Sequence, residues 1–180
     1  QVMAWFMDTY SMHERRTELA VVTGKPLDVG GSAGRREATG RGVLLCVREM
    51  CAHLKMPLAG ARVAVQGFGN VGSVAADLMA KDGARIVAAA DVTGAIQNPD
   101  GLDMPKLLAW VKERRGVAGF PGGQPLVTPI VELDCDILVP AALENQIHLG
   151  NVDRLKTKMI AEAANGPTTP GADEKLAQRG

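Results

Sequence analysis

Three glycines near the middle of the chain have the spacing G-x-G-x-x-G. The run is Gly67, Phe68, Gly69, Asn70, Val71 and Gly72. In such a motif the first glycine permits a tight turn, the second lets the backbone approach a pyrophosphate, and the third lets a helix pack close to a strand. The helix N-terminus adds free N–H groups and the positive end of the helix dipole. The motif therefore predicts phosphate binding, and the alternative is a purely structural turn.

The elements around the glycines decide between these readings, because the motif alone is a weak signal. Arg62–Gln66 is a short β-branched run that predicts a strand, and 73–81 has a helical pattern. Arg85–Asp91 predicts a second strand, which Asp91 closes about 20 residues past the motif. From there the Asp91 carboxylate could accept hydrogen bonds from the ribose hydroxyls of an adenosine. The alternative for Asp91 is an aspartate that only begins a turn.

The charge around Asp91 bears on which dinucleotide would bind. A carboxylate at this position repels a 2′-phosphate, and Val92 and Thr93, which follow it, supply no cation. The cofactor is therefore expected to be NAD or NADP, with the charge of Asp91 favouring NAD.

The remaining pattern predicts an alternation of strands and helices. Helices are expected over 1–16, 38–54, 73–81, 104–115 and 171–179, and strands over 62–66, 85–91, 135–142 and 158–163. A short helix is expected after the third strand, before a loop at 145–151. Continuous apolar strands that alternate with helices predict an α/β fold with a doubly wound, mainly parallel Rossmann-type sheet and helices on both faces. We expect residues 1–180 to form one dinucleotide-binding domain, with 1–56 as a helical and loop lead-in.

Composition excludes several other functions. The 20 basic and 20 acidic residues balance, which leaves no electrostatic footprint for nucleic acid. The few aromatic residues, 3% of the chain, provide no platform on which bases could stack. No apolar run reaches the roughly 20 residues that a membrane-spanning helix needs. We therefore expect neither a nucleic-acid partner nor a membrane.

The cysteines and histidines favour a reducing compartment and no metal site. There are 3 cysteines, none in a C-x-x-C pair, which argues against a disulfide framework and fits a cytoplasmic protein. The 3 histidines do not cluster with the cysteines in the sequence, so no zinc site is expected.

Several long blocks of the sequence resemble the coenzyme-binding part of the family of glutamate, leucine, phenylalanine and valine dehydrogenases. The matching blocks are AWFMDTYSM (4–12), VVTGKP (21–26), GGSAGRREATGRGV (30–43), VQGFGNVG (65–72), NPDGLD (98–103), DCDILVPAALENQI (134–147) and AEAANGPTTP (161–170). QGFGNVG and ANGPTTP are similar to the glutamate branch. The resemblance implies reversible oxidative deamination of glutamate to 2-oxoglutarate and ammonia with NAD(P), in an intact enzyme that is a homo-oligomer, a hexamer.

The resemblance also implies residues that hold the nicotinamide end of the coenzyme. Thr39, in REATG, and Asn70, in GFGN, match positions that hold the nicotinamide carboxamide. A hydroxyl and an amide can fix the orientation of the ring, which is much of what a protein contributes to hydride transfer. The alternatives are a first-turn helix residue for Thr39 and a helix N-cap for Asn70.

Three further positions match residues near the cofactor. Asn165, in ANGPTT, matches a residue beside the nicotinamide ribose, and its alternative is a loop asparagine that tolerates an unusual backbone conformation. Ala141 and Ala142, in PAALEN, match a stretch that passes near the cofactor at the end of a strand, where small residues permit close approach.

The catalytic lysines and aspartate of the family match no position of this sequence. The resemblance implies that they belong to a substrate domain outside residues 1–180, so we assign no catalytic residue and expect the chain alone to be inactive. The first hypothesis is the coenzyme-binding portion of a glutamate dehydrogenase, either excised or naturally short. The second is a catalytically inactive dinucleotide-binding regulatory or partner subunit. A third is a doubly wound domain that binds no nucleotide.

Overall fold

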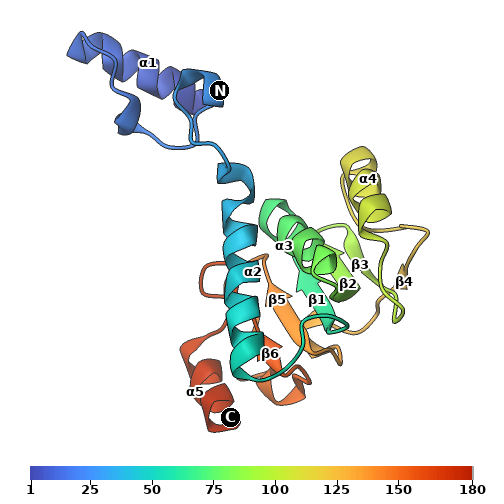
Figure 1. The fold of residues 1–180 in the computed structure, drawn as a ribbon. Helices are drawn as coiled ribbons and strands as arrows, with labels where there is room; N and C mark the ends of the chain where they lie inside the picture. The colour runs from blue at the N-terminus through green and yellow to red at the C-terminus, as the bar shows by residue number, and fades with distance from the viewer. Residues whose placement is uncertain (180) are drawn as a thin grey trace. The chain divides into compact units, whose positions relative to one another are not determined.

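The computed structural model describes residues 1–179 (Figure 1). The chain divides into two compact units, Gln1–Ala38 and a second unit that begins at Thr39. Helix α2, Arg35–His53, begins in the first unit and continues in the second. The assignment of 1–56 as a lead-in stays a prediction.

The first unit is a helix followed by loops. Helix α1, Val2–Glu14, confirms the expected first helix and ends at Arg15, which adopts the left-handed conformation. Two short 3-10 turns follow, η1 at Leu19–Val21 and η2 at Leu27–Val29. The Lys25 ammonium closes the loop between them by donating to the carbonyl oxygens of Leu19 and Val22.

The second unit is built on a six-stranded sheet in the order β4-β3-β2-β1-β5-β6. The strands are β1 Arg62–Gln66, β2 Arg85–Asp91, β3 Gly94–Gln97, β4 Gln124–Pro125, β5 Ile137–Pro140 and β6 Met159–Ile160. β1 pairs in parallel with β2 and β5, and β5 with β6, whereas β3 is antiparallel to both β2 and β4. The expected mainly parallel sheet is confirmed, as are the bounds of β1 and β2.

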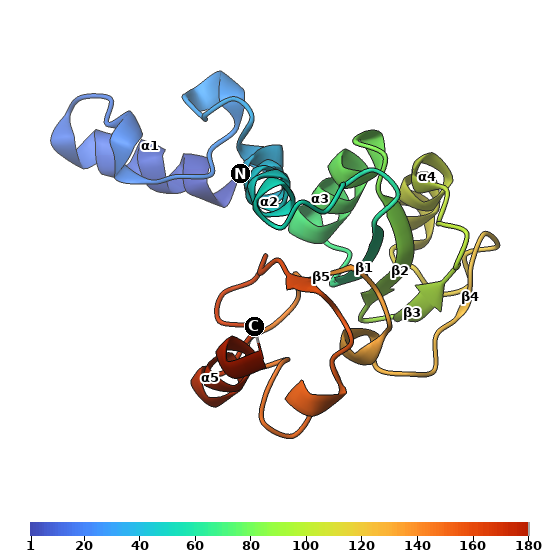
Figure 2. The ribbon, with the colours of Figure 1, turned by 60° about the horizontal axis from the view of Figure 1, so that its bottom comes forward.

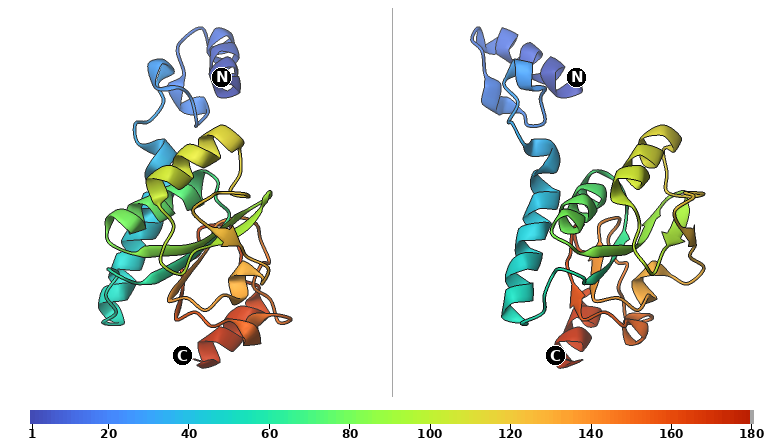
Figure 3. Two further views of the ribbon diagram at one scale, coloured as in Figure 1. Left: turned by 90° about the vertical axis from the view of Figure 1, so that its right-hand side faces the viewer. Right: turned by 45° about the vertical axis from the view of Figure 1, so that its right-hand side comes forward.

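Helices α2, α3 (Asn70–Lys81) and α4 (Met104–Arg114) cover one face of this sheet, while α5 (Pro170–Arg179) lies on the other (Figure 2). The second face also carries the 3-10 turns η3, Ile130–Glu132, and η4, Val152–Arg154. α3 and α4 lie side by side (Figure 3). The expected helices on both faces are thus confirmed.

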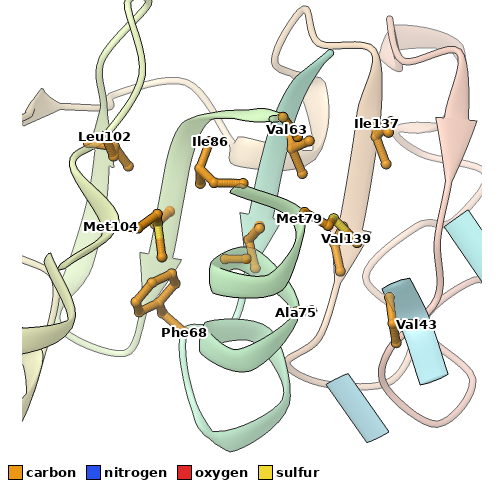
Figure 4. Close-up of a cluster of buried hydrophobic side chains, with 14 of the residues drawn as sticks. Val43, Val63, Phe68, Ala75, Met79, Ile86, Leu102, Met104, Ile137 and Val139 are labelled. Carbon is orange, nitrogen blue, oxygen red and sulfur yellow. The ribbon is translucent and has the colours of Figure 1, made fainter. Parts of the chain in front are cut away.

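Strand β1 contributes side chains to both faces, as alternation along a strand requires. Val63 and Val65 point into the core under α2, α3 and α4, where Val63 meets Ile86 and Met79 (Figure 4). Ala64 points into the core on the opposite face. The strand on which the glycine turn is built is therefore fixed by burial from both sides.

Some expected elements differ in the structure. The expected short helix after the third strand is wrong: residues 141–151 form turns and an isolated bridge from Ile147 to Thr168, and backbone bonds hold this segment to the loop before α5. The fourth strand is only Met159–Ile160. β3 and β4 were not expected, since both strands are too short to show a clear periodicity; β4 is the edge strand and β3 lies between it and β2.

Candidate functional site

The glycine motif lies where the winding of the sheet reverses. From β1 the chain crosses to β2 on one side, whereas β5 on the other side leads to β6. The last residue of β1, Gln66, pairs with Ala90 of β2 and Pro140 of β5. The carboxyl ends of the three strands therefore align, and ligands of doubly wound sheets bind in the crevice at this point.

Two of the three glycines are required by packing. Gly67 has φ +92°, and a Cβ there would lie 2.6 Å from the carbonyl carbon and oxygen of Ala141. A Cβ on Gly72 would overlap the carbonyl oxygen of Gly67. Gly67 thus makes the turn against the end of β5, and Gly72 brings α3 down onto that turn.

Gly69 differs from the other two glycines because packing does not require it. It is exposed, its φ is −82°, and a Cβ would meet no atom within 4 Å. Gly69 is the N-cap of α3, and the Ser73 amide makes the first intrahelical bond, to its carbonyl oxygen at 3.0 Å. The amides of Asn70, Val71 and Gly72, which precede Ser73, have no intrahelical acceptor and point out of the end of the helix. The structure therefore leaves both space and N–H donors at Gly69, as a bound phosphate requires.

The other residues of the motif differ in exposure. Phe68 is 3% exposed and lies in the core beside Met104 and α3 (Figure 4), so only its backbone is available to a ligand. Val71 is half-buried, and Asn70 is exposed as the first residue of α3. The N-cap is Gly69 and makes no side-chain capping bond, so the alternative of Asn70 as the N-cap is wrong.

Asp91 lies at the carboxyl end of β2 and holds a local network. Its Oδ1 accepts from the amide (2.8 Å) and the hydroxyl (2.5 Å) of Thr93, and its Oδ2 accepts from the Val117 amide (2.9 Å). The Thr93 hydroxyl also accepts from the amide of Ala118 (3.2 Å). Asp91 therefore does begin a turn, between β2 and β3. Oδ1 already accepts two hydrogen bonds, whereas Oδ2 accepts one and retains capacity for a ribose hydroxyl.

The loops after β5 and β6 lie together at the same edge. The Ala141 amide donates to the Gln66 carbonyl oxygen (2.6 Å), which ties the Ala141 and Ala142 stretch to β1. The loop that carries Asn165 is tied to the same stretch, because the Asn145 amide donates to the Gly166 carbonyl oxygen (3.0 Å). Positive φ falls on Asn145 and Gly166, so an unusual backbone is not the reason for Asn165.

Helix α2 begins at Arg35, which places Thr39 in the second turn of the helix. Thr39 is exposed there. The alternative of a first-turn residue is therefore wrong. Its neighbour Gly40 is buried against α3. The sequence does not predict this role of Gly40, because a glycine within a helix does not indicate which other helix packs against it.

A glutamine pair was also missed by sequence reasoning. The Gln66 side-chain amide donates to Gln146 Oε1 (2.8 Å), which links β1 to the loop after β5. The Oε1 atom of Gln66 is buried without a hydrogen-bond partner among the described residues. An orphaned buried acceptor at this edge needs a donor from a water or a ligand.

The described residues contain neither a metal-binding cluster nor a membrane-spanning helix. Within residues 1–179, no three or more His, Cys, Asp or Glu side chains gather in a way that could hold a metal ion. No described helix has the length and apolar character to cross a membrane.

The strand order, the reversal beside β1 and the glycine turn at that reversal define a doubly wound α/β domain of the Rossmann type. Comparison with known families is consistent with this class and narrows it. The chain belongs to the Glutamate/Leucine/Phenylalanine/Valine dehydrogenase family, whose model matches residues 30–180. The resemblance seen in the sequence is thereby confirmed.

Individual relatives are glutamate dehydrogenases. That of Thermotoga maritima is 52% identical over 186 residues, covering 99% of this chain and 44% of the relative. The structure of the hetero-hexameric enzyme of Thermus thermophilus, in its Leu-bound form, matches with a TM-score of 0.89 at 36% identity, over 100% of this chain and 42% of that chain. The enzyme of Peptoniphilus asaccharolyticus matches with a TM-score of 0.79 at 36% identity, over 100% of this chain and 42% of that chain. This chain therefore spans less than half the length of these relatives.

Proposed function

We propose that this chain is the coenzyme-binding portion of a glutamate dehydrogenase. The parent reaction is the reversible oxidative deamination of glutamate to 2-oxoglutarate and ammonia with NAD(P). The observation that carries the proposal is Gly69, which has open space over its α-carbon at the N-terminus of α3 and no packing reason to be glycine. Membership of the family and the glutamate dehydrogenase relatives support the choice of reaction.

The pyrophosphate fits the first turn of α3. The backbone of Gly67–Gly72 would surround it, with the amides at the start of the helix as donors and the helix dipole favouring the negative charge. The bulk of a Cβ at Gly69 would occupy the space that the phosphate oxygens need. Phe68 and Val71 contribute through their backbone and their packing.

The two ends of the coenzyme would extend from this point in opposite directions. We assign the adenosine ribose to Asp91 and the nicotinamide carboxamide to Thr39 and Asn70. Asn165 would lie beside the nicotinamide ribose, and Ala141 and Ala142 would allow the coenzyme to approach the end of β5.

When bound, the coenzyme supplies the hydride acceptor for deamination and the hydride donor for the reverse reaction. The residues of this chain then bind and orient the nicotinamide so that one face is presented to the substrate. Deamination also needs a base for the proton of the α-amino group and cations for the substrate carboxylates. We assign neither to residues 1–180.

Coenzyme choice follows from the charge at Asp91. Members of this family use NAD(P), and we propose NAD for this chain, because a carboxylate at the adenosine ribose repels a 2′-phosphate. A cation near Asp91 would weaken this preference for NAD. Arg115 lies two residues before Val117, whose amide donates to Asp91. Dissociation constants for NADH and NADPH decide, and tighter binding of NADPH would reject the charge argument.

A second candidate is a catalytically inactive regulatory or partner subunit. The glutamate dehydrogenase of Thermus thermophilus is hetero-hexameric, so enzymes with more than one kind of subunit occur among the structural neighbours.

For the intact protein we propose a hexamer with glutamate and 2-oxoglutarate as substrates, and a cytoplasmic location.

The experiment has two arms on purified residues 1–180. Titration with NADH, followed by fluorescence, is expected to show saturable binding. NADH production from NAD and glutamate is expected to be absent. Failure to bind NADH or NADPH would reject the coenzyme role, and turnover at the rate of the intact relatives would reject the placement of the chemistry outside these residues.

A further inference from the structure

Gly40 lies where α2 crosses α3, and no side chain fits there. A Cβ on Gly40 would lie 2.7 Å from Val74 Cγ1, 2.8 Å from Val74 Cβ and 2.9 Å from the backbone nitrogen of Ala75. All three distances are shorter than van der Waals contact. Because two of these atoms are fixed to the α3 backbone, a side-chain rotation cannot relieve the clash. Any larger residue at position 40 must move the two helices apart.

This crossing lies next to two residues assigned to the nicotinamide. Gly40 directly follows Thr39 on α2. On α3, Val74 lies four residues after Asn70, and residues four apart share one face of a helix. The contact at Gly40 is therefore one residue from Thr39 on α2 and about one helical turn from Asn70 on α3.

We infer that Gly40 is a positioning residue for the nicotinamide end of the coenzyme, an inference that rests on the proposed function. The missing side chain sets the separation of α2 and α3. That separation sets whether the Thr39 hydroxyl and the Asn70 amide reach the same carboxamide. Gly40 itself touches no coenzyme atom in this role.

The other parts of the proposed site belong to elements other than α2. The pyrophosphate turn belongs to β1 and α3, and Asp91 belongs to β2 and is bound by Thr93 and Val117. A change in the position of α2 is therefore expected to weaken binding of the nicotinamide and to spare the ADP-ribose part of the molecule. A general loss of folding would weaken both.

Gly42 provides a matched control on the same helix. A Cβ on Gly42 would meet no atom within 4 Å, so Gly42→Ala makes the same chemical change without closing a gap. Both substitutions raise intrinsic helix propensity equally. Any difference between the two variants therefore reports the crossing at position 40.

The experiment measures dissociation constants for NADH and for ADP-ribose with wild type, Gly40→Ala and Gly42→Ala. We expect the dissociation constant for NADH to rise about three- to tenfold in Gly40→Ala, because the variant loses one hydrogen bond to the coenzyme. ADP-ribose binding by Gly40→Ala, and binding of both ligands by Gly42→Ala, are expected to match wild type. Circular dichroism verifies that each variant is folded.

The outcomes separate this inference from the proposed function. Wild type that binds neither ligand would reject the proposed function and the inference with it. Wild type that binds both, with a folded Gly40→Ala that binds NADH equally well or loses both ligands in parallel, would overturn the inference alone. Should Gly40→Ala not fold, Val74→Ile enlarges the same contact from α3, and the same selective loss of NADH affinity is then required.

Discussion

The two edges of the sheet satisfy their polar groups in different ways. At the amino edge, where β1, β5 and β6 begin, charged side chains form bonds between the starts of neighbouring strands. The Arg62 amide donates to Asp136 Oδ2 (2.8 Å), the Arg62 guanidinium donates to Asp134 Oδ1 (2.9 Å), and Lys158 Nζ lies 2.9 Å from Asp136 Oδ1. Each strand start is therefore bound to its neighbour by the chain's own groups.

At the carboxyl edge the chain leaves groups available. The amides at the start of α3 have no intrahelical acceptor, Gly69 has open space above it, and Gln66 Oε1 is buried without a partner among the described residues. We infer from this difference that the amino edge contributes stability, and we propose that the carboxyl edge binds a ligand. Substitutions at the two edges are expected to affect different measurements.

The largest expected effect is on stability, at a part of the carboxyl edge that is closely packed. Gly72→Ala places a Cβ into the carbonyl oxygen of Gly67 and 3.1 Å from Val65 Cγ1. We expect the free energy of unfolding to fall by about 3 kcal/mol or more, the upper part of the range for overpacking. Urea denaturation measures it, with Gly42→Ala as the control. A Gly72→Ala protein as stable as wild type would show that the helix does not need this close approach.

The next effect is at the amino edge. Asp136→Asn removes the carboxylate that meets both Arg62 and Lys158, and we expect it to lower the free energy of unfolding by about 1–3 kcal/mol at neutral pH. NADH affinity is expected to stay at the wild-type value, because the change lies at the opposite edge. Weaker NADH binding by a folded Asp136→Asn protein would contradict the division between the edges.

The same carboxylate predicts a pH dependence. Burial of Asp136 opposes its ionisation, but the amide of Arg62 and the ammonium of Lys158 outweigh it, so the pKa of Asp136 lies below its ordinary value. The stabilisation is then fully present above the pKa of the unfolded chain, about 3.9, and is lost as the pH falls through the folded pKa. The stability difference between wild type and Asp136→Asn should shrink below about pH 4. A difference that persists at lower pH would exclude ionisation of Asp136 as its source.

A smaller effect is expected at Asp91. Asp91→Asn replaces one acceptor oxygen by a donor and removes the charge, so we expect NADH affinity to fall about three- to tenfold while NADPH affinity is unchanged or rises. The ratio of the two dissociation constants is the measurement. Thr93→Ser, which keeps the hydroxyl bound to Asp91, serves as the control. An unchanged ratio in Asp91→Asn would assign Asp91 to the turn alone.

Much of the fold could be predicted because its central strands are buried on both faces. β1 and β2 are short apolar runs bounded by glycine turns, and their ends were predicted to the residue. β3 and β4 could not be found, since they have 4 and 2 residues and are defined by their antiparallel pairing with β2 and with each other rather than by a pattern of their own. The expected helix after β5 failed for a similar reason: backbone bonds to the loop around Gly166 hold that segment in turns.

The part of the site that could be predicted is the glycine turn, because glycines at this spacing have a recognised structural role. The spacing of Gly67, Gly69 and Gly72 predicted the turn and a separate role for each glycine, but the sequence could not show which atoms Gly67 and Gly72 pack against. It also could not show Gly40 against Val74, which are 34 residues apart in the chain. Such contacts are set by how helices cross and have no local signature.

The most direct test of a ligand site at the carboxyl edge is NADH titration of wild type and Gly69→Val. A Cβ at Gly69 would meet no atom of the protein within 4 Å, so the variant is expected to fold. It would fill the space that the pyrophosphate needs. We predict saturable NADH binding by wild type and none by a folded Gly69→Val protein. Equal NADH affinity of the two proteins would contradict the account.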